Sequence, residues 1–141
     1  MAHCTLIRPE QLIDLRWRVL RQGRPRESAV FPGDAQATHH GLWQDEHLLV
    51  VLSLFSNPLV HNGATYPQQL RGMATDPVCQ GQGLGSQLLF EVQALGPLWC
   101  NARLRARAFY ARAGWQVIDS EFDLPEVGPH QRMVWAPTLC P

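Results

Sequence analysis

A glycine-rich segment at residues 80–86, Gln-Gly-Gln-Gly-Leu-Gly-Ser, has the residue types and spacing that point most directly to chemistry. It follows a stretch typical of a strand and precedes a periodic stretch typical of a helix. The first N–H groups of a helix have no intrahelical acceptor, and the helix dipole gives that end a positive potential. Gly81, Gly83 and Gly85 lack a Cβ, so an anionic phosphate can approach the main chain closely. The segment therefore predicts a phosphate-binding turn.

The spacing within this turn distinguishes it from two other phosphate-binding loops. No Gly-Lys-Ser/Thr is present, which excludes the P-loop of NTPases. The dinucleotide-binding fingerprint needs a third glycine where this chain has Ser86. Gln80-Gly81-Gln82-Gly83-Leu84-Gly85 instead resembles the Q/R-x-x-G-x-G/A signature of the GNAT superfamily, the acyl-CoA-dependent N-acyltransferases. The preceding strand, which ends in Met73-Ala74-Thr75-Asp76-Pro77, resembles the same family.

A second block of sequence carries the same resemblance. Residues 99–103 read Trp-Cys-Asn-Ala-Arg, and residues 108–115 read Ala-Phe-Tyr-Ala-Arg-Ala-Gly-Trp. Members of the family commonly have a short strand that ends in Asn, then a helix with a Phe/Leu-Tyr pair, then Gly-Phe. Here Trp115 replaces the usual Phe, and the interval from Asn101 to Tyr110 is slightly longer than in many members. The resemblance covers roughly residues 38–136.

The resemblance implies a fold and a co-substrate. The fold is mixed α/β in one acyltransferase domain over residues 1–141, with a mostly antiparallel sheet of about six or seven strands and helices on both faces. The sheet is expected to splay between the strand at 66–75 and the strand at 98–101, where the pantetheine arm of acetyl-CoA would pair with a strand edge. The residues expected to contact the co-substrate are Met73, Ala74, Thr75, Gln80, Gly81, Gln82, Gly83, Leu84, Gly85, Ser86 and Asn101.

The implied reaction is attack of a primary amine, on a small molecule or a protein, on the thioester of acetyl-CoA in a ternary complex. Tyr110 occupies the helix position at which the family points a phenol toward the thioester sulfur, so we expect it to protonate or hydrogen-bond the leaving thiolate. The alternative is that Tyr110 only packs the helix on the sheet. The expected donor to the oxyanion is the main-chain N–H of Met73 or a neighbour. Asn101 binds the pantetheine or a water, or else caps a strand end.

The general base is less well defined by the sequence. His130 is the candidate because it titrates near neutrality and begins the last strand, where the family often shapes the acceptor pocket. A structural histidine or a chain of water molecules is the alternative. Rival candidates are Glu27, Asp34, His39, His40 and Glu126. The adjacent His39 and His40 point to opposite faces of a strand, so no metal site is expected.

The remaining elements follow from periodicity and from turn residues. Two loops, Gln22–Thr38 and Asn57–Tyr66, are expected to build the acceptor side, and Arg24, Arg26 and Asp34 are candidates for recognising a carboxylate or an amine. The expected helices cover a segment opened by Pro9-Glu10, then 84–95 and 104–113. The expected strands cover 5–8, 38–43, 47–55, 66–75, 98–101, 115–122 and 130–136, with a turn at 124–129.

Composition limits the other functions. The 12 basic residues, all of them Arg, balance 12 acidic residues, which argues against nucleic acid as a partner. The chain has no apolar run of about eighteen residues and no signal peptide, so no membrane partner and a cytoplasmic location are expected. Cys4, Cys79, Cys100 and Cys140 are expected to be free thiols. A monomer or a homodimer is expected. The alternative function is a catalytically silent acyl-CoA-binding regulatory or interaction module; a nucleotide-binding protein is a weaker one.

Overall fold

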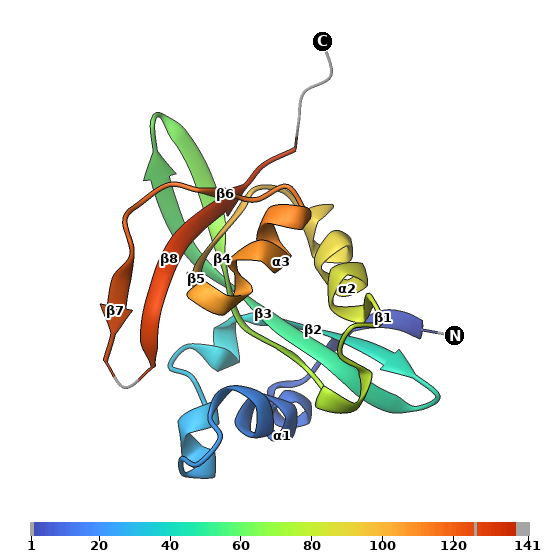
Figure 1. Cartoon of the computed structure of the whole chain (residues 1–141). Coiled ribbons are helices and arrows are strands. Elements are labelled where there is room, and N and C mark those ends of the chain that lie inside the picture. The colour runs from blue at the N-terminus through green and yellow to red at the C-terminus, as the bar shows by residue number, and fades with distance from the viewer. Residues whose placement is uncertain (1, 126, 138–141) are drawn as a thin grey trace. The chain divides into compact units, whose positions relative to one another are not determined.

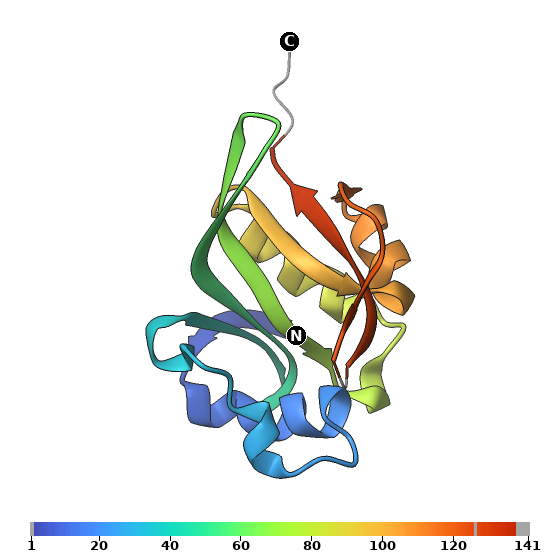
Figure 2. The same ribbon diagram turned by 90° about the vertical axis from the view of Figure 1, so that its left-hand side faces the viewer.

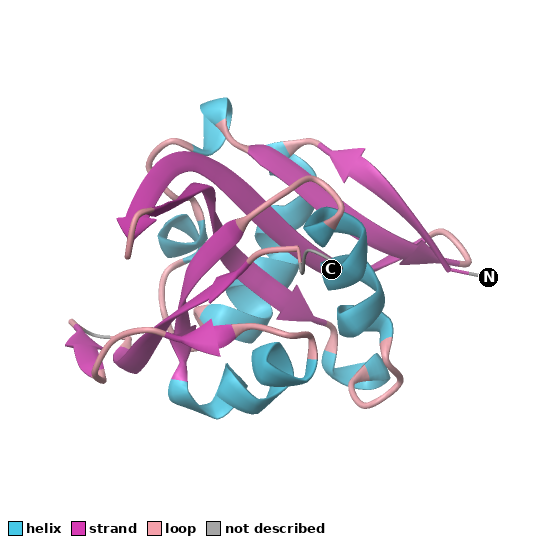
Figure 3. Ribbon diagram, turned by 90° about the horizontal axis from the view of Figure 1, so that it is seen from above, coloured by secondary structure: helices cyan, strands magenta, loops and turns pink. Residues whose placement is uncertain are grey.

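The computed structural model describes residues 2–125 and 127–137, which form strands, two longer α-helices and a shorter third one (Figures 1 and 3). The helices are α1 (Pro9–Leu20), α2 (Leu84–Gln93) and α3 (Arg107–Arg112). The strands are β1 (Ala2–Ile7), β2 (Thr38–Gln44), β3 (His47–His61), β4 (Ala64–Thr75), β5 (Leu98–Arg103), β6 (Gln116–Val117), β7 (Phe122–Leu124) and β8 (Gly128–Trp135). Short 3₁₀ turns lie at Arg26–Ala29, Asp34–Gln36, Pro77–Cys79 and Leu104–Ala106.

The strands form one hydrogen-bonded sheet in the order β1-β2-β3-β4-β5-β8-β6, with β7 paired to β8. The pairing of β4 with β5 is parallel, whereas β1 with β2, β2 with β3, and β8 with β5, β6 and β7 are antiparallel. This confirms the predicted mixed α/β fold with a mostly antiparallel sheet. The sheet has eight strands because the single strand expected at 115–122 is replaced by β6 and β7, which pair separately with β8.

A parallel ladder joins β4 to β5. It pairs Gln68 with Leu98 and Gln69 with Trp99. The splay expected farther along these two strands stays a prediction.

The chain divides into two compact units, and β3, β4 and α2 each contribute to both. Unit 1 contains the residues up to Phe55 together with Leu70–Glu91. Unit 2 contains Ser56–Gln69 together with the residues from Val92 onward.

In unit 1, α1 and α2 lie on opposite sides of the strands (Figure 1). α1 begins at Pro9, which suits the first helical position, and Gln11 Oε1 accepts a hydrogen bond from the Arg8 N–H at 2.8 Å. Its buried side chains pack with Val51 of β3 and Ala74 of β4. Because side chains alternate along a strand, Val50, Leu52 and Leu54 of β3 face the other way, and they too are buried. Burial on both faces explains the continuous apolar run in β3.

One predicted loop is wrong. Residues 57–66 were expected to be a loop because of Pro58 and of the Asn62-Gly63 pair, but β3 and β4 continue through this region as a hairpin (Figure 2). Leu54 is the last β3 residue paired with β2, so the missing N–H of Pro58 removes no bond to that neighbour. Asn62 and Gly63 have φ of 48° and 79°, as in a two-residue hairpin turn.

Two tryptophans tie the elements of unit 2 together. Trp99 Nε1 of β5 donates to the main-chain oxygen of Asn57 at 2.7 Å. Trp115 Nε1 donates to Gln93 Oε1 at the end of α2, at 2.8 Å, and both of these residues are buried. The helix expected at 104–113 is a 3₁₀ turn followed by α3, and Gly114 follows it with φ 95°.

Candidate active site

The glycine turn is anchored where it leaves β4. The Asp76 N–H donates to the main-chain oxygen of Leu49 at 2.8 Å, and Asp76 Oδ1 accepts from the Val78 N–H at 3.1 Å. Asp76 Oδ2 also pairs with Arg18 of α1 at 3.2 Å. Gln80 Nε2 donates back to the oxygen of Thr75 at 3.3 Å. These contacts fix the start of the turn on the strand and on α1.

The turn itself presents main-chain N–H groups on the surface of unit 1. Gly81 and Gly83 have φ of 83° and 79°, a conformation that favours glycine. Residues 80–83 are exposed, and a Cβ at either glycine would meet open space. The Gln87 N–H donates to the Gly83 oxygen at 3.1 Å. The N–H groups of Leu84, Gly85 and Ser86 precede that first helical bond, and none of them has a main-chain acceptor in the part of the chain that the structure describes.

This arrangement fits a phosphate held by neutral donors. The sequence from Gly72 to Ala102 contains no Arg or Lys, and its charged residues are Asp76 and Glu91. The turn therefore offers main-chain N–H groups and the positive end of α2, without a cationic side chain from its own segment.

The end of β4 supplies the other expected co-substrate residues. Ala74 is buried with Leu12 and Leu15 of α1, which fixes the facing of the strand. Met73 and Thr75 are half-buried and alternate with Ala74 along the strand. Gly72, with φ 66°, precedes them, and a Cβ there would lie 2.9 Å from Arg16 Nε and 3.1 Å from Phe31 Cε2. A glycine is therefore required at this position for two independent reasons.

Tyr110 lies in α3 of unit 2 and is buried. Its ring packs edge-on against Phe109, with centroids 5.2 Å apart, and against Trp115 at 5.1 Å. Burial raises the pKa of the Tyr110 phenol well above its usual value, and the nearby Cys100 raises this pKa further. The phenol is therefore protonated at neutral pH. Tyr110 therefore packs against its aromatic neighbours, as the structural alternative expects, and it also carries a proton that it can donate.

His130 and Asn101 belong to the paired strands β8 and β5 of unit 2. The His130 ring is buried, and its Nδ1 lies 2.8 Å from the Gly128 oxygen. Because a carbonyl only accepts, Nδ1 carries the proton and Nε2 is the basic nitrogen of the neutral ring. Asn101 lies inside β5 rather than at its end, so it is not a strand-end cap. Its Oδ1 is buried and has no hydrogen-bond partner among the described residues, a state that calls for a donor.

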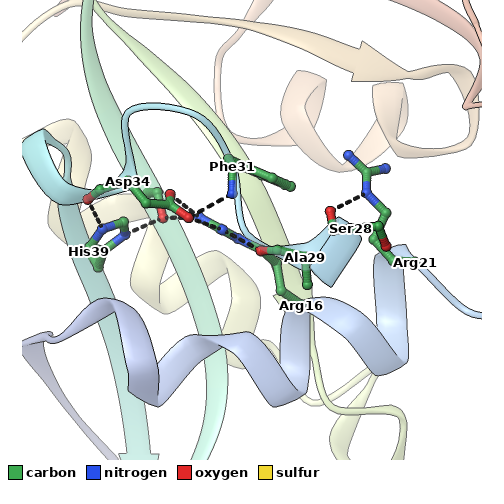
Figure 4. A network of polar contacts seen from close by, with 8 residues as sticks. Arg16, Arg21, Ser28, Ala29, Phe31, Asp34 and His39 are labelled. Atoms are coloured by element: carbon green, nitrogen blue, oxygen red, sulfur yellow. Dashed lines mark hydrogen bonds and ion pairs between the residues drawn. The ribbon is translucent and has the colours of Figure 1, made fainter. Parts of the chain in front are cut away.

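Unit 1 contains a buried polar network that is not predicted from the sequence (Figure 4). Arg16 of α1 is fully buried and binds both carboxylate oxygens of Asp34, at 2.8 and 3.0 Å. It also donates to the Ala29 oxygen at 2.7 Å and to Ser53 Oγ at 3.0 Å. Burial alone would raise the pKa of Asp34, but the bonds from Arg16 and from the Phe31 N–H outweigh it, so this pKa lies below its usual value. Asp34 is therefore held as a carboxylate in a buried ion pair with Arg16.

The same network includes His39, which is one of the other candidates for the general base. His39 Nδ1 lies 2.6 Å from Ser53 Oγ, and His39 Nε2 lies 2.8 Å from the Asp34 oxygen, so both ring nitrogens are engaged. Burial lowers the pKa of His40, and the neighbouring His39 lowers it further. Glu27 is exposed in a 3₁₀ turn. Glu126 lies outside the described residues, as does Cys140, whereas Cys4, Cys79 and Cys100 are free thiols.

No group of three or more His, Cys, Asp or Glu side chains in residues 2–125 and 127–137 is placed to hold a metal ion. None of the helices described for this chain has the length and apolar character needed to cross a bilayer.

Comparison with known proteins identifies the family. The model of the acetyltransferase (GNAT) domain matches residues 44–117. The uncharacterized N-acetyltransferase YitI of Bacillus subtilis (strain 168) is 31% identical over 140 residues, which cover 92% of this chain and 93% of YitI. This chain therefore belongs to the GNAT family of acetyltransferases.

Solved structures share the fold. A protein from Lactobacillus plantarum described as an N-acetyltransferase matches with a TM-score of 0.78 at 17% identity, covering 96% of this chain and 97% of that one. The N-acetyltransferase YlbP of Bacillus subtilis, solved in complex with coenzyme A, matches with a TM-score of 0.67 at 18% identity, covering 97% of each chain. These likenesses confirm the fold that the glycine turn and the Asn101–Tyr110 block implied.

Proposed function

We propose that the protein is an N-acetyltransferase in which residues 1–141 act as one domain. It transfers the acetyl group of acetyl-CoA to a primary amine of a small molecule or a protein, by direct attack in a ternary complex. The observation that carries the proposal is the turn at residues 80–86, which is exposed at residues 80–83 and in which the N–H groups of Leu84, Gly85 and Ser86 have no main-chain acceptor in the described part of the chain. Family membership supports the choice of an acyl-CoA over another phosphate ligand.

The turn, β4 and β5 each have a proposed binding role. Main-chain N–H groups of Gln80 to Ser86 bind the diphosphate, and the β4 edge at Met73, Ala74 and Thr75 binds the pantetheine amides. Asn101 accepts a hydrogen bond from a pantetheine N–H, or from a water bound there, which would satisfy its unpartnered buried Oδ1.

Three groups are proposed to move protons and charge. Acetyl-CoA supplies the activated thioester. His130 Nε2 accepts the proton that the attacking amine loses, directly or through water. The main-chain N–H of Met73 or a neighbour stabilises the oxyanion, and the C–S bond then breaks. The Tyr110 hydroxyl donates a hydrogen bond or its proton to the thiolate, a role supported by the raised pKa that keeps it protonated.

An acetyl-transfer assay with a matched pair of variants tests this proposal. Gly83→Asp places a carboxylate on the turn, where it repels a diphosphate. Gly63→Asp is the control, because Gly63 has the same φ of 79° and its Cβ also meets open space, at the tip of the β3–β4 hairpin. Asp tolerates this conformation better than most residues. Mass spectrometry after incubation with acetyl-CoA and a panel of amines should show transfer by the parent and by Gly63→Asp, with at least tenfold less by Gly83→Asp.

The same assay separates the alternative function. Stabilisation by CoA in a thermal-shift measurement, without transfer to any amine of the panel, would identify a catalytically silent acyl-CoA-binding module. The absence of both stabilisation and transfer would refute the proposal. We also propose the cytoplasm as the compartment, in keeping with the free thiols Cys4, Cys79 and Cys100, and a monomer or homodimer as the working form.

A further inference from the structure

Three guanidinium groups surround one aromatic ring in unit 1. The Cζ atom of Arg16 lies 3.7 Å from the centre of the buried Phe31 ring, that of Arg71 lies at 4.7 Å and that of Arg21 at 5.2 Å. Arg71 is in addition 5.1 Å from the centre of the Phe55 ring. Like charges repel, so a cluster of this kind is stable only where anions or ring faces compensate it.

The charges of this cluster do not balance. Asp34 contributes one carboxylate, and Arg16 binds both of its oxygens. Arg21 Nε donates to the main-chain oxygen of Ser28 at 3.3 Å, which is a neutral partner. Arg71 is half-buried between two aromatic rings, and its guanidinium has no ion pair or hydrogen bond with any residue that the structure describes. An arginine has five N–H donors, so Arg71 has unused capacity for an anion.

The surroundings make an anion favourable at Arg71. Burial lowers the pKa of Arg71, Arg16 lowers it further, and Asp34 opposes them in part. A carboxylate of a ligand would compensate the excess positive charge of the arginine cluster. A partly desolvated guanidinium binds a carboxylate through two parallel hydrogen bonds, and Phe31 and Phe55 hold its plane in place.

The position of Arg71 in the chain relates it to the proposed chemistry. Arg71 lies two residues before Met73, and the main-chain N–H of Met73 is a proposed oxyanion donor. Two residues of a strand span about 6–7 Å. The intervening Gly72 has a positive φ of 66°. In an amino acid the amine and the carboxylate are separated by one or a few carbon atoms, so one molecule can reach both a carboxylate-binding side chain and the reacting thioester.

We propose that Arg71 binds a carboxylate of the acceptor, so that the preferred acceptors are amines that also carry a carboxylate, such as free amino acids. This inference rests on the proposed N-acetyltransferase function and narrows its substrate class. Arg71 is a specificity-determining residue that touches the acceptor and takes no part in proton transfer. If it served only to cover the two phenylalanine rings, it would not distinguish a carboxylate from an amide.

The test compares acceptors that differ only in that charge. Free α-amino acids, β-alanine and γ-aminobutyrate are offered with saturating acetyl-CoA, each beside its amide, and kcat/KM is measured for every pair. The variants are Arg71→Met, which keeps an apolar stem, and Arg71→Lys, which keeps the charge without the planar fork. Arg105→Met is the control, because Arg105 is exposed and the variant removes the same charge. The CoA dissociation constant of each variant reports whether the fold and the co-substrate site are intact.

The expected result has a specific form. The parent and Arg105→Met prefer the carboxylate over the amide, and Arg71→Met lowers kcat/KM for the carboxylate by about ten- to a hundredfold. Its kcat/KM for the amide is unchanged, and Arg71→Lys falls between the two. Equal losses on acid and amide, or a parent that prefers amides, would overturn this inference and leave the acetyltransferase proposal intact. A parent that neither binds CoA nor acetylates any acceptor would overturn both.

Discussion

The glycine turn and the Arg16 network both lie in unit 1, and they differ in what holds them together. The turn is built from main-chain groups of residues 80–86, whose positive-φ glycines and helix start are consecutive in the sequence. The network joins Arg16, Asp34, His39 and Ser53, which come from a helix, a 3₁₀ turn and two strands. The N–H groups of Leu84, Gly85 and Ser86 in the turn have no main-chain acceptor in the described chain, whereas in the network almost every polar atom is bound. The proposed ligand site and the structural network are thus opposite in their hydrogen bonding.

The largest expected effect comes from breaking the network. Arg16→Met leaves Asp34 buried without its cation, so we expect the free energy of unfolding to fall by about 3–5 kcal/mol. The matched control is Arg26→Met, because the Arg26–Asp14 pair is exposed and separated by 3.6 Å. Its loss should change stability by about 1 kcal/mol or less. Urea denaturation of both variants measures the difference, and equal small losses would show that the network contributes little.

Acid should weaken the same network. The folded-state pKa of Asp34 lies below its ordinary value of 3.8, so its contribution to stability is present above that pH. This contribution is lost as the pH falls through the lower, folded-state pKa. Asp34→Asn should therefore be less stable than the parent at pH 7, and the gap should narrow toward pH 3. A gap that stays constant in urea denaturation at both pH values would contradict the assignment.

Secondary structure was predictable where local signals agreed. Pro9, the glycines of the turn and the apolar run at residues 48–52 each specify a conformation within a few residues. The prediction failed at Pro58, because its effect depends on where the ladder with β2 ends, which no local signal reveals. It failed also at residues 115–122, where a short strand pairs with β8 and the chain then leaves the sheet before β7.

Side-chain sites were predictable only in part, for the same reason. Tyr110, Asn101 and the turn were proposed as site residues through a sequence motif whose residues are close in the chain, and their roles stay predictions. Arg16 lies on a helix whose other arginine, Arg18, is exposed, so its complete burial could not be inferred from periodicity. Arg71 depends on Phe31 and Phe55, which are remote in sequence. Asp34 was wrongly considered for substrate recognition because its partner lies 18 residues away.

Tyr110 is buried, and its hydroxyl has a proposed chemical role whereas its ring has a packing role. We expect Tyr110→Phe to keep the ring contacts with Phe109 and Trp115, to lower turnover at least tenfold and to leave the affinity for CoA nearly unchanged. Tyr66→Phe is the control, since Tyr66 is the other tyrosine of the chain and is half-buried in β4. Steady-state kinetics with acetyl-CoA check this prediction, and unchanged turnover would remove Tyr110 from the mechanism.

The smallest expected effect belongs to His130. His130→Ala should lower turnover and change the shape of the pH–rate profile, because the neutral Nε2 is the proposed proton acceptor. His61→Ala, in the β3–β4 hairpin, is the comparison. A profile that keeps its shape in His130→Ala would assign proton removal to water or to another group.

The most direct test of the central claim measures how much binding energy the turn draws from the diphosphate. Isothermal titration of the parent with CoA and with pantetheine, which lacks the diphosphate, gives the two dissociation constants. We expect CoA to bind at least tenfold more tightly, and Gly83→Asp, unlike Gly63→Asp, to abolish that difference. Equal affinities of the parent for the two ligands, or a preference that survives Gly83→Asp, would contradict the assignment of residues 80–86 as the diphosphate site.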